Sequence, residues 1–146
     1  MSKPMDSVHV GANYFDQAFE DPSDLIDMAR KTLKDVEYDT MVGTGLSGSL
    51  VIPVLAHALD KNFAIVRKER SLHDTSEVVG RIGHRWIFVD DFIATGATRE
   101  KVIGAMSTLI TYNPRTYENV PLVSEYVGTY QYGTMYGITK RFIPSH

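Results

Sequence analysis

Apolar residues along this chain gather in short continuous runs that are bounded by polar, glycine or proline residues. Runs of this kind are typical of strands that are buried on both faces of a sheet. They predict strands at residues 40–42, 62–68 and 85–91, and a fourth within residues 117–127. The run at 85–91, RWIFVDD, is apolar throughout its centre and ends in two carboxylates.

The segments between these runs have helical features. Pro22-Ser23-Asp24 predicts a helix start, with acidic residues early and basic residues late in the segment. A second helix is expected at about residues 49–59, and a third after the turn at 94–98, with one side formed by Val102, Ile103, Met106 and Ile110. Residues 69–84 are polar and contain glycine, which predicts a long loop or a loose hairpin.

Strands that alternate with helices predict an α/β fold with a mainly parallel, twisted sheet flanked by helices. Such sheets bind ligands beyond the carboxyl ends of their strands. Glycine-containing turns follow two of the predicted strands, at residues 43–48 and 94–98. Both turns are therefore expected at the ligand-binding edge of the sheet.

Composition narrows the possible functions. The 146 residues suit one domain, and the net charge of −3 without a basic run gives no case for nucleic-acid binding. The absence of cysteine excludes a disulfide framework and a thiolate metal site or nucleophile. The longest apolar stretch is too short to span a membrane, and the first residues lack targeting features, so a cytoplasmic protein is expected. No protein metal site is expected from His9, His57 and His84, which have no partners at ligand spacing.

The acid pair Asp90-Asp91 falls where a buried strand emerges from the sheet. Two adjacent carboxylates at such a position are costly unless they meet hydroxyls, a metal ion or water. The turn that follows directs backbone N–H groups and hydroxyls to the positive end of a helix, and it is formed by the small residues Ala94, Thr95, Gly96, Ala97 and Thr98. Diol-binding acids a few residues before a phosphate-binding turn predict a site for a ribose 5-phosphate.

This combination resembles the signature of the type I phosphoribosyltransferases, which bind phosphoribosyl diphosphate (PRPP). Their motif has four apolar residues, two acids, two apolar residues and a phosphate loop rich in threonine and glycine. Twelve positions match, in strand–turn–helix order: Trp86, Ile87, Phe88, Val89, Asp90, Asp91, Phe92, Ile93, Thr95, Gly96, Ala97 and Thr98. The alternative, that the acids only cap a turn, accounts for one carboxylate better than for two.

The earlier glycine turn, GTGLSG, has the G-x-G-x-x-G spacing of a dinucleotide-binding fingerprint. That fingerprint requires an acid at the end of the second strand, where this chain has Arg67-Lys68. In the phosphoribosyltransferases a short loop after the first strand binds pyrophosphate through backbone amides. The resemblance assigns that role here to Thr44, Gly45, Leu46, Ser47 and Gly48.

The segment VRKERSLHD resembles the start of the flexible catalytic loop of orotate phosphoribosyltransferases. The resemblance implies that Arg67, Lys68 and His73 contact the pyrophosphate. Ser71 stands where that family has a loop lysine, and whether Arg70 takes over its role is left open.

The resemblance implies transfer of the ribose 5-phosphate of PRPP to a nitrogen of a purine or pyrimidine base, with release of pyrophosphate. Asp90, Asp91, Arg67 and Lys68 would be the catalytic residues. Mg²⁺ would be held mainly by PRPP, with the two aspartates in support. A homodimer is also implied. Ala94 replaces the aspartate of hypoxanthine–guanine enzymes, which argues against that subclass. A substrate such as orotate needs no general base, and Glu69 and Glu77 are the candidates where one is needed.

Base selectivity in this family comes from a variable hood outside the shared core. The resemblance implies a single domain over residues 1–146, with a core at about 36–125 and a hood from about 1–35 and 126–146. Several aromatic residues of the tail could stack on a base, although packing is the favoured role for most: Tyr126, Tyr130, Tyr132, Tyr136 and Phe142.

Two other functions remain open. A PRPP-binding regulator of the same fold with weak catalysis is favoured by Ser71 and by the minimal hood. A more remote alternative is an NAD(P)-binding oxidoreductase, which rests on Gly43, Gly45 and Gly48.

Overall fold

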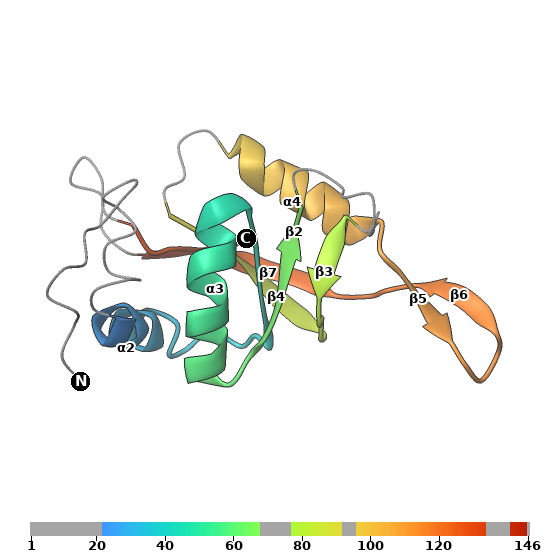
Figure 1. The fold of residues 1–146 in the computed structure, drawn as a ribbon, viewed down its shortest axis with the longest axis horizontal. Coiled ribbons are helices and arrows are strands. Elements are labelled where there is room, and N and C mark those ends of the chain that lie inside the picture. Colours follow the sequence, from blue (N-terminus) through green and yellow to red (C-terminus); the bar gives the residue numbers. More distant parts are fainter. Residues whose placement is uncertain (1–21, 68–76, 92–95, 134–140, 146) are drawn as a thin grey trace, which may run out of the picture.

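The computed structural model describes residues 22–67, 77–91, 96–133 and 141–145. Its centre is a six-stranded sheet with the strand order β3-β2-β1-β4-β7-β8 (Figure 1). β1, β2, β4 and β7 are parallel to one another, while the edge strands β3 and β8 run antiparallel to their neighbours. The strands are β1 (Thr40–Thr44), β2 (Asn62–Val66), β3 (Val78–Gly80), β4 (Arg85–Asp90), β7 (Glu125–Gln131) and β8 (Arg141–Pro144). The predicted α/β class with a mainly parallel sheet is confirmed.

In the part of the chain that the structure describes, three helices cover the two faces of this sheet: α2 (Pro22–Thr32), α3 (Gly45–Leu59) and α4 (Ala97–Ser107). α2 and α3 pack on one face and α4 packs on the other, because the side chains of β1 alternate between two apolar clusters. Met41 lies in the cluster with α2 and α3, whereas Val42 lies in the cluster with α4. Within the described residues, no helix is long and apolar enough to cross a membrane.

The topology creates a switch point between β1 and β4. After β1 the chain passes through α3 to β2 on one side, and after β4 it passes through α4 toward β7 on the other. The two connections therefore diverge at the carboxyl ends of β1 and β4, which are hydrogen-bonded neighbours. Crevices at such points are the usual ligand sites of open α/β sheets.

Several predicted boundaries were wrong. α3 begins at Gly45 instead of about residue 49, so most of the predicted glycine loop is the first turn of a helix. α4 ends at Ser107. Ile110, which was expected on the apolar side of this helix, lies beyond its end and is 64% exposed. Val102 and Met106 are buried as expected.

The fourth predicted strand, within residues 117–127, divides into two elements. β6 (Glu118–Pro121) pairs with β5 (Ile110–Asn113) in a separate two-stranded hairpin that extends away from the main sheet (Figure 1). The strand that joins the main sheet is β7, which starts only at Glu125. β6 ends at Pro121, and the backbone pairing with the β5 side closes one residue later, where the Leu122 N–H donates to the Leu109 carbonyl at 2.9 Å.

The end of the chain contributes to the main sheet, because β7 and β8 both lie in it. Tyr130 and Tyr132 are buried in the cluster with α2 and α3, and Tyr126 packs on Trp86 with ring centroids 4.9 Å apart. Packing, which the sequence analysis favoured over stacking on a base for most of these tyrosines, is consistent with their positions. Tyr136 lies outside the described residues. The division into core and hood stays a prediction.

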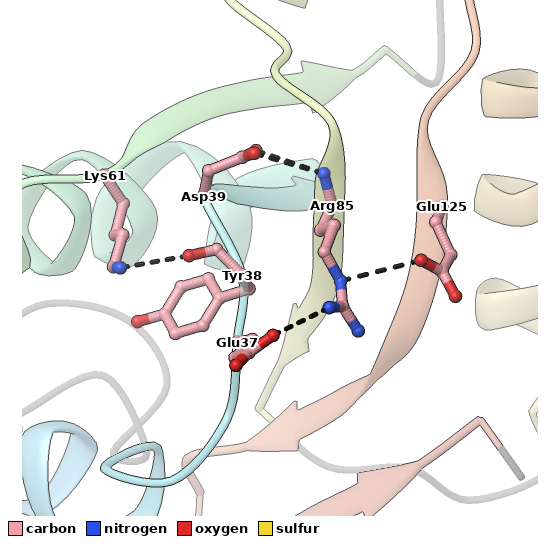
Figure 2. A network of polar contacts seen from close by, with 6 residues as sticks. All are labelled: Glu37, Tyr38, Asp39, Lys61, Arg85 and Glu125. Carbon is pink, nitrogen blue, oxygen red and sulfur yellow. Dashed lines mark hydrogen bonds and ion pairs between the residues drawn. The ribbon is translucent and has the colours of Figure 1, made fainter.

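A network of polar contacts joins the elements at the amino ends of the parallel strands (Figure 2). The carboxylate of Asp39 accepts hydrogen bonds from the backbone N–H of His84 at 2.8 Å and from the Thr40 hydroxyl at 2.6 Å. Arg85 forms ion pairs with Glu37 at 3.0 Å and Glu125 at 3.6 Å. These contacts align the start of β1 with the starts of β4 and β7.

Candidate functional site

The predicted site residues that the structure describes meet at one edge of the sheet. β1, β2 and β4 are parallel neighbours, so their carboxyl ends share this edge. β1 ends at Thr44, which is paired with Val66 at the end of β2, and β4 ends at Asp90. The glycine turn, Arg67 and the acid pair are therefore brought together from segments more than twenty residues apart.

The acid pair terminates β4. Asp90 is the last residue of the strand, Asp91 follows it, and both are half-buried. The backbone N–H of Asp91 donates to the Asp90 carboxylate at 2.9 Å. This local bond turns the chain away from the direction of the strand. Two successive acidic residues thus lie at the switch point, where diol hydroxyls, a metal ion or water would suit their carboxylates.

The amino end of α3 replaces the predicted pyrophosphate loop. Thr44 precedes the helix in an extended conformation, and its hydroxyl donates to the Val66 carbonyl at 2.6 Å instead of capping the helix. Within the described residues, no side chain caps this end and no acid occupies the first turn. The first backbone N–H groups of a 15-residue helix therefore face the edge, which suits an anion. The backbone amides that were predicted to bind pyrophosphate therefore belong to a helix instead of a loop, and their role stays a prediction.

Gly43 and Gly48 allow α3 to pack closely on β1. A Cβ at Gly48 would lie 3.1 Å from the carbonyl carbon of Gly43, and a Cβ at Gly43 would lie 3.2 Å from the carbonyl oxygen of Val89. These glycines place the helix end beside the ends of β1 and β4. Of Leu46 and Ser47, only the helical backbone is described.

The second predicted phosphate turn leads into α4. Gly96 has a φ of 80°, a conformation that favours glycine, and its carbonyl accepts the first helical hydrogen bond from the N–H of Glu100 at 3.0 Å. Ala97 and Thr98 form the exposed first turn. Ala94 and Thr95 lie outside the described residues, as do Phe92 and Ile93.

Arg67 directly follows β2 at the same edge and is half-buried. Its backbone N–H donates to the carbonyl of Glu77 at 2.7 Å, which closes the pairing between β2 and β3. A long loop or a loose hairpin was predicted for residues 69–84; of these, Val78–Gly80 form β3, which pairs antiparallel with β2. Residues 68–76 lie outside the described part, and with them the predicted Lys68 and His73, Arg70, Ser71 and the candidate base Glu69.

The donors at this edge fit a magnesium ion that is held mostly by a ligand. Within the described ranges, no group of three or more His, Asp or Glu side chains is placed to hold a metal ion. Asp90 and Asp91 offer carboxylate oxygens. Mg²⁺ is commonly held by one or two carboxylates together with phosphate oxygens and water. The residues present fit that coordination pattern.

Gly133 is a residue at this edge that the sequence interpretation missed. Its backbone N–H donates to the carbonyl of Asp91 at 2.8 Å, and the N–H of Tyr132 donates to that of Asp90 at 3.0 Å. Nothing in the sequence distinguishes this glycine from the others of the tail. Its contact with the acid pair depends on the pairing of β4 with β7.

Comparison with known proteins gives a consistent assignment of the fold. No family model matches the chain. An adenine phosphoribosyltransferase of Solibacter usitatus (strain Ellin6076) is 34% identical over 100 residues, which cover 54% of this chain and 57% of that protein. The chain thus spans little more than half the length of this curated relative.

Solved structures of phosphoribosyltransferases have a similar fold. UMP synthase of Leishmania donovani has a TM-score of 0.54 at 17% identity over 77% of this chain and 23% of that one. A phosphoribosyltransferase of Corynebacterium diphtheriae has a TM-score of 0.53 at 22% identity over 72% and 60% of the two chains.

Orotate phosphoribosyltransferase of Mycobacterium tuberculosis H37Rv, in complex with PRPP, has a TM-score of 0.51 at 19% identity over 72% of this chain and 55% of that one. At such identities the likeness concerns the fold. Together with the curated relative, these structures confirm the resemblance carried by the acid pair and its turn. This chain therefore has the fold of the type I phosphoribosyltransferases.

Proposed function

We propose that this chain is a PRPP-dependent phosphoribosyltransferase, which transfers ribose 5-phosphate to a ring nitrogen of a base and releases pyrophosphate. The proposal rests on the arrangement of groups at the carboxyl ends of the parallel strands. Two helix amino ends, those of α3 and α4, flank an acid pair at the switch point of the sheet. PRPP has a phosphate at one end, a pyrophosphate at the other and a diol between them, which matches this order of groups.

Different residues would bind the different groups of PRPP. The turn before α4, with Gly96, Ala97 and Thr98, would receive the 5-phosphate, together with Ala94 and Thr95 from the sequence motif. The amino end of α3, from Thr44 to Gly48, would receive the pyrophosphate, with Arg67 beside it and Lys68 and His73 from the following loop. Asp90 and Asp91 would orient the ribose hydroxyls.

Asp90 and Asp91 would also hold Mg²⁺ together with oxygens of PRPP. When bound, the ion would neutralise charge on the departing pyrophosphate. The requirement for Mg²⁺ is part of the proposal and is supported by the chemistry of the donors.

In the reaction, a bond forms between the base nitrogen and C1 of the ribose while the bond from C1 to the pyrophosphate oxygen breaks. The bonding electrons leave with the pyrophosphate, and positive charge develops at C1. The negative field of the two aspartates would stabilise that charge, and the helix ends would stabilise the leaving group. A proton on the attacking nitrogen passes to water or to a base such as Glu77.

The adenine phosphoribosyltransferase relative supports a purine as acceptor, and the orotate phosphoribosyltransferase fold supports a pyrimidine. Adenine and orotate are therefore the first acceptors to test. A homodimer and a cytoplasmic location, both expected from the sequence, remain parts of the proposal.

The test is release of pyrophosphate from PRPP and Mg²⁺ in the presence of adenine, orotate and a wider panel of purines, pyrimidines and pyridine carboxylates. We expect release with one base and none when Mg²⁺ is omitted. Binding of PRPP without release across the panel would favour the regulator. Binding of NAD(P) without binding of PRPP would overturn the proposal in favour of the oxidoreductase.

A further inference from the structure

The acid pair is attached to the end of β7 by two successive hydrogen bonds. The N–H of Tyr132 donates to the Asp90 carbonyl at 3.0 Å, and the N–H of Gly133 donates to the Asp91 carbonyl at 2.8 Å. In a regular strand, successive carbonyl groups point to opposite neighbours. Here two in a row point to β7, so the second bond marks the place where β4 leaves its strand geometry.

The bond from Gly133 acts together with the bond inside the acid pair. The Asp91 N–H donates to the Asp90 carboxylate at 2.9 Å, so the N–H and the carbonyl of Asp91 both have partners. These two bonds define the orientation of both peptide groups of Asp91, and with it the direction in which its side chain leaves the backbone.

Residue 133 has no room for a side chain. Gly133 is buried, and a Cβ built on it would overlap the carbonyl oxygen of Asp91 and lie 3.0 Å from its carbonyl carbon. The obstacle is backbone, which cannot turn aside as the end of a flexible side chain can. A side chain at position 133 must therefore displace Asp91, β7 or both.

We infer that Gly133 is a positioning residue for the acid pair: its N–H and its lack of a side chain set the placement of Asp91 for PRPP. This inference rests on the proposed function. It assigns to the end of β7 a role in PRPP binding that is separate from any contact with the base. The role is exerted through the Asp91 backbone and not by contact with the ligand.

The test compares three glycine-to-alanine variants. Gly133→Ala displaces the acid pair. Gly128→Ala makes a comparable clash elsewhere in β7, because Gly128 has a φ of 152° and its Cβ would overlap Phe142 and approach the Ile143 carbonyl. Gly104→Ala is the neutral control, since nothing lies within 4 Å of a Cβ added on the exposed face of α4.

The readouts are the affinity for PRPP with Mg²⁺, measured by calorimetry, and the melting temperature. Both β7 variants are expected to melt at lower temperature than wild type. Only Gly133→Ala is expected to weaken PRPP binding, by roughly 10- to 100-fold, because misplacement of a binding group by about 1 Å has effects of this size. Equal affinities for Gly133→Ala and wild type, or equal losses in both β7 variants, would overturn the inference.

Two further measurements keep the outcomes distinct. Backbone amide resonances of Asp90 and Asp91 should shift in Gly133→Ala and stay unchanged in Gly128→Ala, and unchanged resonances in both variants contradict the inference. If Gly133→Ala does not fold, backbone amide hydrogen exchange of the wild-type protein, with and without PRPP, tests the role of Gly133 instead. PRPP should then slow exchange at the Gly133 amide more than at Gly128, and equal slowing overturns the role.

Failure of the proposed function looks different from failure of this inference. If the wild-type protein does not bind PRPP, both the proposed function and the inference about Gly133 are wrong. If the wild-type protein and Gly133→Ala bind PRPP equally well, only the inference about Gly133 is wrong.

Discussion

The edge of the central sheet at the amino ends of the parallel strands (the amino edge) and the edge at their carboxyl ends (the carboxyl edge) both carry acidic residues, but in different arrangements. At the amino edge, Asp39 accepts backbone N–H groups and the cation of Arg85 lies between two acids (Figure 2). At the carboxyl edge, two aspartates lie next to one another and helix amino ends face outward. The first arrangement brings opposite charges together within the chain, whereas the second has two acidic residues in succession at the end of a strand.

Under the proposed function, the carboxyl edge serves binding, while the contacts at the amino edge serve stability. Like charges at a half-buried site cost free energy that hydroxyls or a cation can recover. A carboxylate that accepts several N–H groups stabilises the fold without any ligand. Asp39 and Asp91 are thus a natural pair for separating the two roles.

The pKa of Asp39 reflects its structural role. Partial burial by itself would raise the pKa, but hydrogen bonds from the Thr40 hydroxyl and from the N–H groups of His84 and Arg85, with the nearby charge of His84, hold it below its ordinary value of 3.8. A lowered pKa means that the ionised form stabilises the folded state. This stabilisation is present above about pH 4 and is lost as the pH falls through the lowered pKa.

The largest effect is expected for Asp91→Asn at the carboxyl edge. Removal of the charge should weaken binding of PRPP with Mg²⁺ about 100-fold, or about 2.7 kcal/mol, because the proposed function places this carboxylate against the cation and the ribose. The melting temperature should change little, since asparagine keeps the size of the side chain and an oxygen that accepts hydrogen bonds. Calorimetric titration and thermal unfolding of one preparation measure both quantities. A loss of stability with unchanged affinity would reverse the roles given to the two edges.

The next effect is expected for Asp39→Ala at the amino edge. Loss of the acceptor for the His84 N–H and the Thr40 hydroxyl should lower the free energy of unfolding by about 1–3 kcal/mol, with PRPP affinity unchanged. Urea unfolding checks the value. Glu37→Ala is the matched control, because Glu37 is 85% exposed and its ion pair with Arg85 should contribute less than about 1 kcal/mol.

The contribution of Asp39 should also depend on pH in one direction. The difference in unfolding free energy between wild type and Asp39→Ala should be full at pH 7 and should shrink as the pH is lowered below about 4, because protonation removes the favourable charge. Urea unfolding at several pH values measures it. A difference that grows on acidification contradicts the assignment.

The smallest effect is expected for Tyr38→Phe. The ring of Tyr38 lies under the Lys61 ammonium at 4.4 Å and is kept in this variant. The hydroxyl is buried and, among the described residues, has no hydrogen-bond partner, so its removal should leave stability near pH 7 unchanged or raise it by up to about 1 kcal/mol.

Burial raises the pKa of Tyr38 to about 12. The folded state therefore keeps this proton, and the associated stability is present below pH 10 and lost as the pH rises toward 12. Spectrophotometric titration of wild type minus Tyr38→Phe should show a tyrosine that ionises near pH 12. One that ionises at pH 10 or below would contradict burial of this hydroxyl.

Local patterns were enough for the elements whose signal is contiguous. The strand that ends in Asp90 and the turn into α4 could be predicted because strand, acids and small residues follow one another in one stretch. The packing of Tyr130 and Tyr132 followed from their position in an apolar, tyrosine-rich tail.

Boundaries that depend on distant contacts were not predictable in the same way. The glycines at positions 43, 45 and 48 are compatible with a loop, whereas in the structure the helix starts at Gly45 and packs closely on β1. The strand pattern of residues 117–127 continues across Pro121, and which part joins the sheet is decided by pairing with β4.

The sequence by itself determined the class of fold and the place of the acid pair at the end of a buried strand, because each is encoded by neighbours along the chain. Only the tertiary structure decided that Thr44, Arg67 and Asp90 share one edge and that Gly133 touches Asp91. The physical reason is that parallel pairing joins segments far apart in sequence, and their register is set by packing across the whole sheet.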